Sequence, residues 1–509
     1  METTLAKGAN RILFFNTLAF TICFGAWMLN GVLVTFLVDN QVFNWGPVEI
    51  GWLLGIPVLT GSIFRLPAGI LTDKYGGRPV FTILLLLSAI PMFMLSQVNS
   101  FTGFALCSFG FGLTGTGFAI GIAFTSIWFP KKWQGTALGI FGAGNAGAAI
   151  TTLFAPTLLI KLTNGGVDID NWRTLPMIYS GALVLMAVIF FVFTKNKKPE
   201  TTTKTLGVML APLKSIRVWR FGLYYFLVFG CFVAFSQWLV PYFVNVYYMP
   251  LVTAGILAAL FSFPSGVIRA LGGWLSDRFG GRAVMYWVLS ASVAVSFMLI
   301  IPKMDIYSPG KGIMAAKNGV VTAVSNTEIT VGEKVYSLKT KDGELENTDF
   351  QELIFPAKEV WQEPVVKVGD EVVKKQLLAK GVTRIFFQAN VWIFAILVIL
   401  IGSIWGIGKA AVYKHIPDYF PNEVGVVGGM VGVIGGLGGF VCPIIFGYLL
   451  EGTGLWTSAW MFMFLISVIC LVWMHRVIQK MMYKKHPDSM RQMENKSVPI
   501  INIKHGSKH

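Results

Sequence analysis

Long apolar segments recur along the whole chain, and polar segments separate them. A helix needs ~20 consecutive apolar residues to cross the hydrocarbon core of a bilayer, and twelve segments reach that length. They predict twelve transmembrane helices, which we place over roughly 11–37, 47–72, 78–98, 101–128, 134–161, 174–194, 218–246, 252–276, 282–302, 385–412, 423–449 and 456–478.

The composition supports a multi-pass membrane protein with the lipid bilayer as its first partner. Of 509 residues, 54% are hydrophobic and 13% are charged, whereas a soluble domain carries about 25% charged residues. The polar residues 1–10 lead directly into a segment long enough to span, so we expect no cleavable signal peptide. The five cysteines lie in apolar segments without the spacing of metal ligands, so we expect no metal site and no cofactor.

The net charge of +16 is distributed unevenly. Lysines and arginines collect in alternate connections and in the C-terminal tail, while the intervening short connections contain few of them. By the positive-inside rule, this distribution predicts that both termini are cytoplasmic and that the protein resides in the cytoplasmic (inner) membrane. The basic charge is therefore interpreted as a topology signal, and nucleic acid is excluded as a partner.

The chain contains an internal repeat. Residues 65–78 and 269–282 share an arginine, a glycine four residues later, an aspartate eight residues later and a basic turn. The spacing Gly-x3-Gly-x2-Gly at 135–142 recurs at 425–432, and Phe-Pro at 129–130 recurs at 420–421. The repeat predicts an all-α membrane protein with two six-helix halves. The expected parts are an N-terminal half (1–194), a cytoplasmic linker (195–217), a C-terminal half (218–302 and 384–480) and a cytoplasmic tail (481–509).

One polar segment, 303–383, interrupts the second half. It follows the ninth predicted span, so it is expected outside the cell, and its length lets it cross regardless of charge. Four short β-type runs, at 319–324, 328–331, 334–338 and 365–368, predict a small β-rich domain. Turn signals lie at Asn326, at Asp342-Gly343 and at Gly369-Asp370. Residues 368–381 resemble one hairpin of a lipoyl-like barrel sandwich. A structural ornament and a lid or partner-binding role both stay open.

Arg65 and Arg269 each lie inside an apolar segment, eight residues or ~12 Å of helix before the loop aspartate. An arginine within a membrane span costs at least ~2.5–3.5 kcal/mol, so two at matching positions suggest a shared role. The guanidinium is planar and offers N–H donors in a fork that suits an oxyanion with two accessible oxygens. We therefore predict a small-anion site between the halves; snorkelling to the headgroups is the alternative.

The stretches from Asp73 to Arg78 and from Asp277 to Arg282 resemble the cytoplasmic loop motif of the major facilitator superfamily, between spans two and three and between eight and nine. The resemblance implies a fold of two six-helix halves. It also implies that these four charged residues are gating groups that latch neighbouring helices in one conformation. The alternative is that they only set the topology.

The glycine-rich fifth and eleventh spans resemble the two nitrate signatures of the nitrate/nitrite porter (NarK-like) family within that superfamily. Small residues let helices approach closely, which predicts a packing role for most of these glycines. Asn145 differs, because a buried amide needs hydrogen-bond partners. The glycines that carry the resemblance are Gly139, Gly142, Gly144 and Gly147 in the first copy, and Gly432, Gly435 and Gly436 in the second.

This second resemblance implies a secondary transporter of nitrate and nitrite that works by alternating access. It implies that Arg65 and Arg269 bind the anion and that Asn145 lines the site. It also implies aromatic walls on spans four, seven and ten. The matching residues are Phe118, Tyr225 and Tyr413.

Lys409 departs from the family pattern, in which a neutral polar residue is common at this place. It lies eight residues before Pro417, at a depth similar to that of Arg65. Lys409 is either a third cation of the site, a proton-carrying group, or a lysine that snorkels or pairs locally. His415 lies nearer the cytoplasmic end and is expected to be structural.

No nucleotide-binding loop, zinc-protease pair or nucleophile elbow occurs in the sequence, so an enzyme and an ATP-driven pump are not expected. The expected partners are small inorganic anions and, as a candidate co-substrate, protons; a monomer is expected. Nitrate/nitrite antiport and nitrate/proton symport stay open. A transporter of formate, oxalate or another small anion is the first alternative, and a transporter-like sensor that uses residues 303–383 is the second.

Overall fold

The computed structural model describes residues 7–198, 211–301, 304–341, 355–420 and 424–485. Within these residues, eleven helices are long and apolar enough to cross a membrane, or twelve if one bent pair counts as a span. The predicted all-α fold is therefore confirmed. Much of the linker, residues 199–210, and of the tail, residues 486–509, lies outside the described residues.

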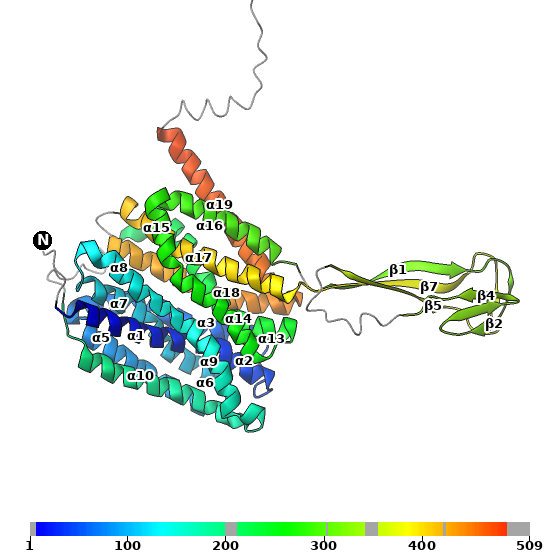
Figure 1. Ribbon diagram of the computed structural model, residues 1–509, viewed down its shortest axis with the longest axis horizontal. Helices are drawn as coiled ribbons and strands as arrows, with labels where there is room; N and C mark the ends of the chain where they lie inside the picture. The colour runs from blue at the N-terminus through cyan, green and yellow to red at the C-terminus, as the bar shows by residue number, and fades with distance from the viewer. Residues whose placement is uncertain (1–6, 199–210, 302–303, 342–354, 421–423, 486–509) are drawn as a thin grey trace, which may run out of the picture.

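The two halves of the bundle lie one above the other in Figure 1. The helices of the N-terminal half are α1 (Ala9–Trp27), α2 (Leu29–Asp39), α3 (Pro47–Ile63), α4 (Arg65–Tyr75), α5 (Gly77–Met94), α6 (Phe101–Phe111), α7 (Gly117–Ser126), α8 (Lys131–Gly142), α9 (Gly147–Leu162) and α10 (Thr174–Phe193). Those of the C-terminal half are α12 (Ile216–Tyr225), α13 (Phe232–Tyr247), α14 (Leu251–Val267), α15 (Arg269–Phe279), α16 (Gly281–Met298), α17 (Val391–Tyr419), α18 (Val424–Thr453) and α19 (Ser458–Lys485).

Several spans are interrupted near their middle. A 3₁₀ turn at Gly112–Thr116 separates α6 from α7, and another at Ala143–Ala146 separates α8 from α9. A π-helical turn at Phe226–Cys231 joins α12 to α13. The pair α14–α15 bends by 40°. Such interruptions leave backbone groups outside the regular ladder, and they often occur at functional sites.

The segment inserted after α16 forms a long arm that projects from one end of the bundle (Figure 1). One antiparallel sheet has the order β1-β7-β5 and the other has the order β4-β3-β2-β6. The strands are β1 (Met304–Met314), β2 (Gly319–Val324), β3 (Glu328–Val331), β4 (Lys334–Ser337), β5 (Ala357–Pro364), β6 (Glu371–Val372) and β7 (Leu377–Phe387). Cross-strand pairs support the register: Lys380 pairs with Glu363 at 2.9 Å, and Arg384 with Asp305 at 2.9 Å.

The predicted β-rich character of this arm is confirmed, with three differences in detail. The predicted strand at 365–368 is wrong, because these residues form the connection after β5, where Val366 is buried in the small core of the arm. The long strands β1 and β7 were not predicted. β7 continues to Phe387, so the tenth span begins at Val391 rather than at 385. The predicted turn at 342–343 lies outside the described residues.

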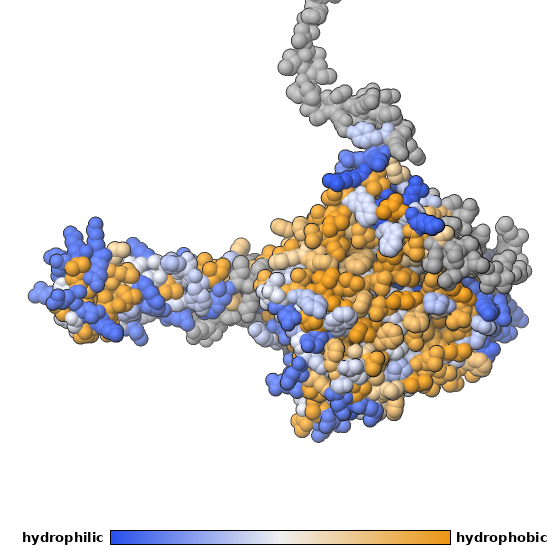
Figure 2. Space-filling view, turned by 180° about the vertical axis from the view of Figure 1, so that it is seen from behind, coloured by the Kyte–Doolittle hydropathy of each residue, from blue (hydrophilic) through white to orange (hydrophobic). Residues whose placement is uncertain are grey.

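The surface of the bundle suits a membrane. Figure 2 shows hydrophobic residues over most of its side, whereas hydrophilic residues gather on the arm and near the edges of the bundle. The protein is therefore a multi-pass membrane protein.

The halves pack tightly at the end that carries the arm. A methyl group added at Gly51 of α3 would overlap the Pro443 carbonyl oxygen of α18, and one at Gly55 would lie 2.6 Å from the Phe440 oxygen. On the other side of the interface, a methyl group at Gly255 of α14 would overlap a backbone oxygen of α9. Glycine is required at these places because the helix backbones touch.

Glycines nearer the opposite end have room around them. A methyl group added at Gly69, Gly139, Gly273 or Gly429 would have no neighbour within 4 Å among the described residues. These residues belong to the repeated segments of α4, α8, α15 and α18. The bundle is therefore packed at the arm-bearing end and more open toward the ends of α4 and α15 that contain Asp73 and Asp277.

Candidate functional site

Arg65 begins α4, directly after the break that ends α3. Its side chain is buried, with 5% of the residue exposed. Nη1 donates a hydrogen bond of 2.9 Å to the Gly432 carbonyl oxygen of the other half. Nε and Nη2 are buried, and they have no hydrogen-bond partner in the described part of the chain. Arg65 therefore keeps donors available at the interface between the halves.

Arg269 occupies the equivalent place in the other half, since it begins α15 after the bend that ends α14. Its residue is partly exposed. Nη1 is buried without a hydrogen-bond partner among the described residues. That nitrogen lies 3.9 Å from the position that a Cβ at Gly142 would take. Arg269 thus reaches from the C-terminal half to the fifth span of the N-terminal half.

The two arginines are related by the internal repeat, and so are the glycines they approach. Arg65 contacts Gly432 and Arg269 lies beside Gly142, and Gly142 and Gly432 are equivalent residues of the two glycine-rich segments. Each half therefore directs its arginine at the glycine-rich segment of the opposite half. A methyl group at Gly142 would make an ordinary contact with Arg269 Nη1 at 3.9 Å, whereas one at Gly432 would lie 3.1 Å from the Tyr413 hydroxyl.

Phe118 contacts both cations. The guanidinium carbon of Arg65 lies 5.4 Å from the centre of its ring, and that of Arg269 lies 6.0 Å from it. Both distances are within the ~6 Å range of cation–π attraction. Phe118 lies in the first turn of α7, just after the 3₁₀ interruption of its span. The ring therefore joins the two arginines within one site.

The aromatic walls predicted on spans seven and ten also lie here. Tyr413 lies 5.8 Å from the Arg269 guanidinium carbon and donates a hydrogen bond of 3.1 Å to the Gly428 oxygen. Tyr225 packs against Tyr413 with ring centres 5.0 Å apart. The Tyr225 hydroxyl is buried without a hydrogen-bond partner among the described residues.

Lys409 is fully buried in α17. Its Nζ donates a hydrogen bond of 2.9 Å to Ser265 and lies 3.1 Å from the centre of the Phe232 ring. Ser265 precedes Arg269 by about one helical turn, so the lysine lies beside the arginine. The described contacts of Lys409 include no carboxylate, which makes snorkelling or local ion pairing a poor description of this side chain.

Asn145 lies in the 3₁₀ turn between α8 and α9. It is 3% exposed, and neither amide atom has a hydrogen-bond partner in the described part of the chain. A buried amide without partners is costly. Asn145 therefore offers a donor and an acceptor near the segment that Arg269 approaches.

The structure thus gathers Arg65, Arg269, Phe118 and Tyr413 at one interface, with Lys409 and Tyr225 directly behind them.

Comparison with known proteins identifies the family. A model described as Major Facilitator Superfamily matches residues 15–326 and 377–503. The probable nitrate/nitrite antiporter NarK1 of Thermus thermophilus is 39% identical over 481 residues, 93% of each chain. This chain belongs to the major facilitator superfamily. Within it, the chain is a member of the nitrate/nitrite porter family, so the protein is a transporter and not an enzyme.

Other relatives agree with this membership. The nitrite extrusion protein of Bacillus subtilis (strain 168) is 25% identical and covers 89% of this chain and 91% of its own. A bacterial homologue of the human lysosomal transporter Spinster has a TM-score of 0.61 at 13% identity, over 92% of this chain and 96% of its own. The nucleoside transporter NupG has a TM-score of 0.55 at 13% identity, over 92% and 98%. At these identities the solved structures show the shared fold alone.

Contacts of the superfamily loop residues join neighbouring helices. Arg78 donates from Nε to the Phe191 oxygen at 2.8 Å, which ties α5 to α10. Asp277 pairs with Lys414 at 2.5 Å, which ties α15 to α17. Arg282 donates to the Tyr419 hydroxyl at 2.8 Å. No described contact pairs Asp73 with Arg78 or Asp277 with Arg282.

The glycines of the two signatures differ in their surroundings. Added methyl groups at Gly144, Gly147, Gly435 and Gly436 would overlap neighbouring helices or side chains, and one at Gly432 would lie 3.1 Å from the Tyr413 hydroxyl. At Gly142 the nearest neighbour is 3.9 Å away, and Gly139 has open space. Close packing thus explains most of these glycines in this conformation.

Sequence reasoning missed several contributors to the site. Trp27 and Phe229 lie 5.8 Å and 5.5 Å from the Arg65 guanidinium carbon, and Ser265 receives the hydrogen bond from Lys409. Lys409 itself was named from the sequence, but its counterpart in the repeat was not. At the offset of 291 residues that relates the two Phe-Pro pairs, Lys409 is the counterpart of Phe118, within Gly-x-Gly-Phe-Ala and Gly-x-Gly-Lys-Ala.

Proposed function

We propose that this protein is a secondary transporter that carries nitrate and nitrite across the cell membrane by alternating access, with the anion held between Arg65 and Arg269. The observation that carries the proposal is the crossed arrangement of the two arginines. Each directs its guanidinium at the glycine-rich segment of the opposite half, and each keeps buried N–H groups without a hydrogen-bond partner among the described residues. Relatives named as a nitrate/nitrite antiporter and a nitrite extrusion protein support the choice of anion.

The donors suit a small planar oxyanion. A guanidinium presents parallel N–H groups, and two guanidiniums from opposite sides can serve the oxygens of one nitrate or nitrite ion. The Phe118 and Tyr413 rings supply apolar walls that limit the space beside the anion, and Asn145 supplies an amide. Formate has a similar outline, so a comparison of anions is part of the test.

The position of the site between the halves links binding to motion. Two unit charges 4 Å apart repel by about 4 kcal/mol at an effective dielectric near 20. An anion between Arg65 and Arg269 would neutralise this repulsion and let the halves close around it. An empty site would resist closure, which favours exchange of one anion for another.

The open glycines of α4, α8, α15 and α18 fit the second conformation of such a cycle. If the halves closed at the end that contains these glycines, the four segments would pack against one another. The segments at the arm-bearing end are already packed in this way. In this proposal Asp73, Arg78, Asp277 and Arg282 stabilise one of the two states. The helix ends that contain these four residues and both termini are cytoplasmic, and the arm is outside the cell.

Lys409 favours a second coupling mode. Its buried ammonium has only the Ser265 hydroxyl and aromatic rings as described partners, and it lies beside Arg269. Loss of its proton would remove one positive charge from the site. Lys409 therefore provides a route for proton-coupled nitrate uptake, in competition with exchange.

The test is uptake of labelled nitrate into proteoliposomes that contain the purified protein. We expect counterflow with internal nitrate or nitrite, and little with formate or oxalate; equal counterflow with all four would contradict the nitrate assignment. Uptake with and without internal nitrite, under an imposed or a collapsed pH gradient, separates exchange from symport.

Arg269→Lys tests the paired-guanidinium site. It keeps the charge and removes the fork, so nitrate uptake should fall by about 10-fold or more. The matched control is Arg278→Lys on the same helix, where the guanidinium stacks on the exposed Trp274 at 5.4 Å. Near-normal uptake by Arg269→Lys would refute the proposed clamp.

A further inference from the structure

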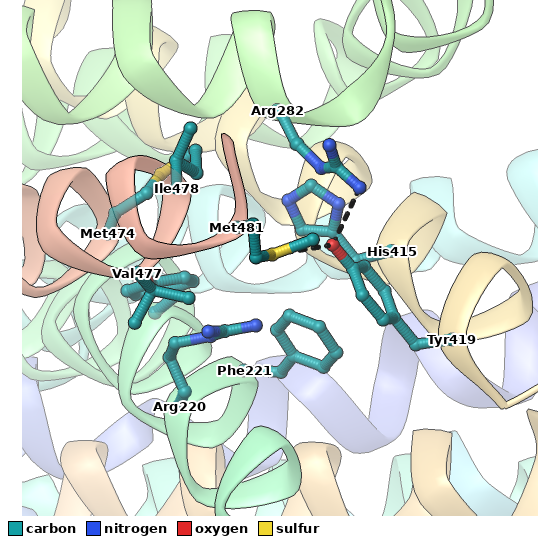
Figure 3. A pocket seen from close by; sticks show the side chains of 10 residues that line it. Arg220, Phe221, Arg282, His415, Tyr419, Met474, Val477, Ile478 and Met481 are labelled. Atoms are coloured by element: carbon teal, nitrogen blue, oxygen red, sulfur yellow. Dashed lines mark hydrogen bonds between the residues drawn. The ribbon is translucent and has the colours of Figure 1, made fainter. Parts of the chain in front are cut away.

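A second cationic pocket lies at the far end of the C-terminal half from the arm. Four helix segments meet there: the second half of α12, the first turn of α16, the last turns of α17, and α19. Figure 3 shows Arg220 and Arg282 on different sides of this pocket, with Phe221, His415 and Tyr419 between them. The apolar side chains of Met474, Val477 and Ile478 from α19 form another wall.

The surroundings of Arg220 distinguish this pocket. Only 9% of the residue is exposed, and no hydrogen bond or ion pair of its guanidinium occurs among the described residues. Its guanidinium carbon lies 5.2 Å from the Phe221 ring, so a ring face is its nearest described counterpart. Most of the side chain is covered while the guanidinium opens into the pocket, and a cation in such a place normally has a partner of opposite charge or a set of hydrogen bonds. Arg220 lacks both within the described structure.

A second polar group at the pocket also has no described hydrogen-bond partner. The Tyr224 hydroxyl lines the pocket, is buried, and has no hydrogen-bond partner among the described residues. Arg282 uses one nitrogen for the Tyr419 hydroxyl. The Tyr419 ring also lies 5.6 Å from the Arg282 guanidinium carbon and 5.4 Å from that of Arg217. Three arginines thus converge on one region, and the described lining contains no carboxylate.

The helix directions add to the positive potential. Arg217 and Arg220 lie near the start of α12, and Arg282 is the second residue of α16. The N-terminal end of a helix carries partial positive charge, so basic residues there are disfavoured and an anion is favoured. An anion at this place would interact well with the arginines and with the N-terminal end of α16.

The space defines the size and the placement of that anion. The pocket is open on one side, and the water-sized space among its side chains is about 20 Å³, above the ~10–15 Å³ needed for one water molecule. An oxyanion group can therefore enter partly, with the remainder of a larger molecule outside. Basic pockets between transmembrane helices on the cytoplasmic side bind lipid headgroups, and the apolar wall from α19 suits a molecule with an acyl portion.

We propose that the pocket formed by Arg220, Arg282 and Tyr224 binds a phosphate group, from the headgroup of an anionic phospholipid or from free phosphate. This site is separate from the transport site, because all of its described residues belong to the C-terminal half. A phosphate there supplies the missing counter-charge and acceptors for Arg220 and Tyr224. It also ties α12, α16 and α19 together at one end of the half.

The test uses the purified full-length protein in detergent with two probes, phosphatidylglycerol and inorganic phosphate. Native mass spectrometry measures retained phosphatidylglycerol, and the melting temperature measures stabilisation by phosphate. We expect Arg220→Gln to weaken phosphatidylglycerol binding by about 10-fold or more, since it removes a charge-assisted contact. Arg278→Gln is the matched control, because Arg278 stacks on exposed aromatic rings elsewhere on the same half.

The two sources are distinguished by competition. If inorganic phosphate raises the melting temperature of the wild type, but not that of Arg220→Gln, and displaces the lipid, free phosphate is the ligand. If the lipid is retained against phosphate, the headgroup is the ligand. Tyr224→Phe, which removes only a hydroxyl, should weaken the same binding by a few fold and serves where Arg220→Gln does not fold. Unchanged binding of both probes in Arg220→Gln and Tyr224→Phe would overturn the proposal, as would equal loss in Arg278→Gln.

Discussion

Arg65 and Arg269 are equivalent residues of the repeat, but the structure gives them different surroundings. Arg65 is buried and hydrogen-bonded to the Gly432 oxygen of the other half. Arg269 is partly exposed, makes no hydrogen bond among the described residues, and lies next to Lys409. The N-terminal half therefore contributes one anchored cation, and the C-terminal half contributes two cations of which the arginine is unanchored.

A repeat can therefore duplicate the backbone position of a residue without duplicating its contacts. Both arginines begin a helix after a break, so the repeat places them symmetrically. Phe118 and Lys409 are also counterparts, yet one is an aromatic ring and the other a cation. We infer that Arg65 holds the halves together in this conformation, while Arg269 remains available for the anion.

The largest expected effect tests the anchored arginine. Arg65→Lys should lose both the fork toward the anion and the geometry of the bond to Gly432, so nitrate uptake should fall by about 100-fold or more. Uptake into proteoliposomes measures this, with Lys74→Arg on the exposed part of the same helix as control. A milder defect than that of Arg269→Lys would reverse our assignment of the two roles.

The second prediction compares glycines near the two arginines. A methyl group at Gly436 would overlap the Ser62 hydroxyl and lie 3.2 Å from Arg65 Nη1, whereas one at Gly142 would lie 3.9 Å from Arg269 Nη1. Gly436→Ala should destabilise this packed state by ~1–3 kcal/mol and reduce transport strongly, and Gly142→Ala should transport nearly normally. Melting temperature and uptake measure the two effects. Equal behaviour of both variants would show that the two sides of the interface are packed alike.

The third prediction concerns the additional cation of the C-terminal half. Lys409→Gln should remove the pH dependence of nitrate uptake while exchange with internal nitrite continues, because the variant cannot carry the proton. Uptake measured across a range of external pH tests this, with Lys480→Gln, an exposed residue of α19, as control. Unchanged pH dependence would rule out a proton role for Lys409.

The smallest expected effect concerns the arm, which is present only in the second half. Met304 and Phe387 are directly paired in the antiparallel register of β1 and β7, so a short glycine-serine turn between them can replace the segment without moving α16 or α17. We expect nitrate uptake to change by less than about 2-fold. Loss of uptake in a correctly inserted protein would make the arm part of the transport cycle. Absence of nitrate transport with and without the arm would favour the sensor alternative.

Several residues of the interface could be predicted from the sequence, and others could not. Arg65, Arg269, Phe118 and Tyr413 were all named from motifs, and the structure places them around one interface. The strand predicted at 365–368 was wrong, because its apolar residues also suit a buried connection. The tenth span was placed too early, because β7 continues the apolar pattern to Phe387. The crossed contacts of the arginines with opposite glycines could not be predicted, since the repeat relates positions within the halves and not the fit between them.

The membrane class, the two-half repeat, the β-rich arm and the charged residues within the spans could all be read from the amino-acid sequence. These features follow from hydrophobic segment length, from the cost of charge in a bilayer and from spacing, all of which are local along the chain. The packing of the helices shows that Arg65 is hydrogen-bonded across the interface while Arg269 makes no described hydrogen bond, that Lys409 is buried against Ser265, and that Arg220 faces a pocket whose described lining has no counter-charge. These properties depend on how helices far apart in sequence approach one another, and at the interface that approach is set by glycine contacts and helix breaks.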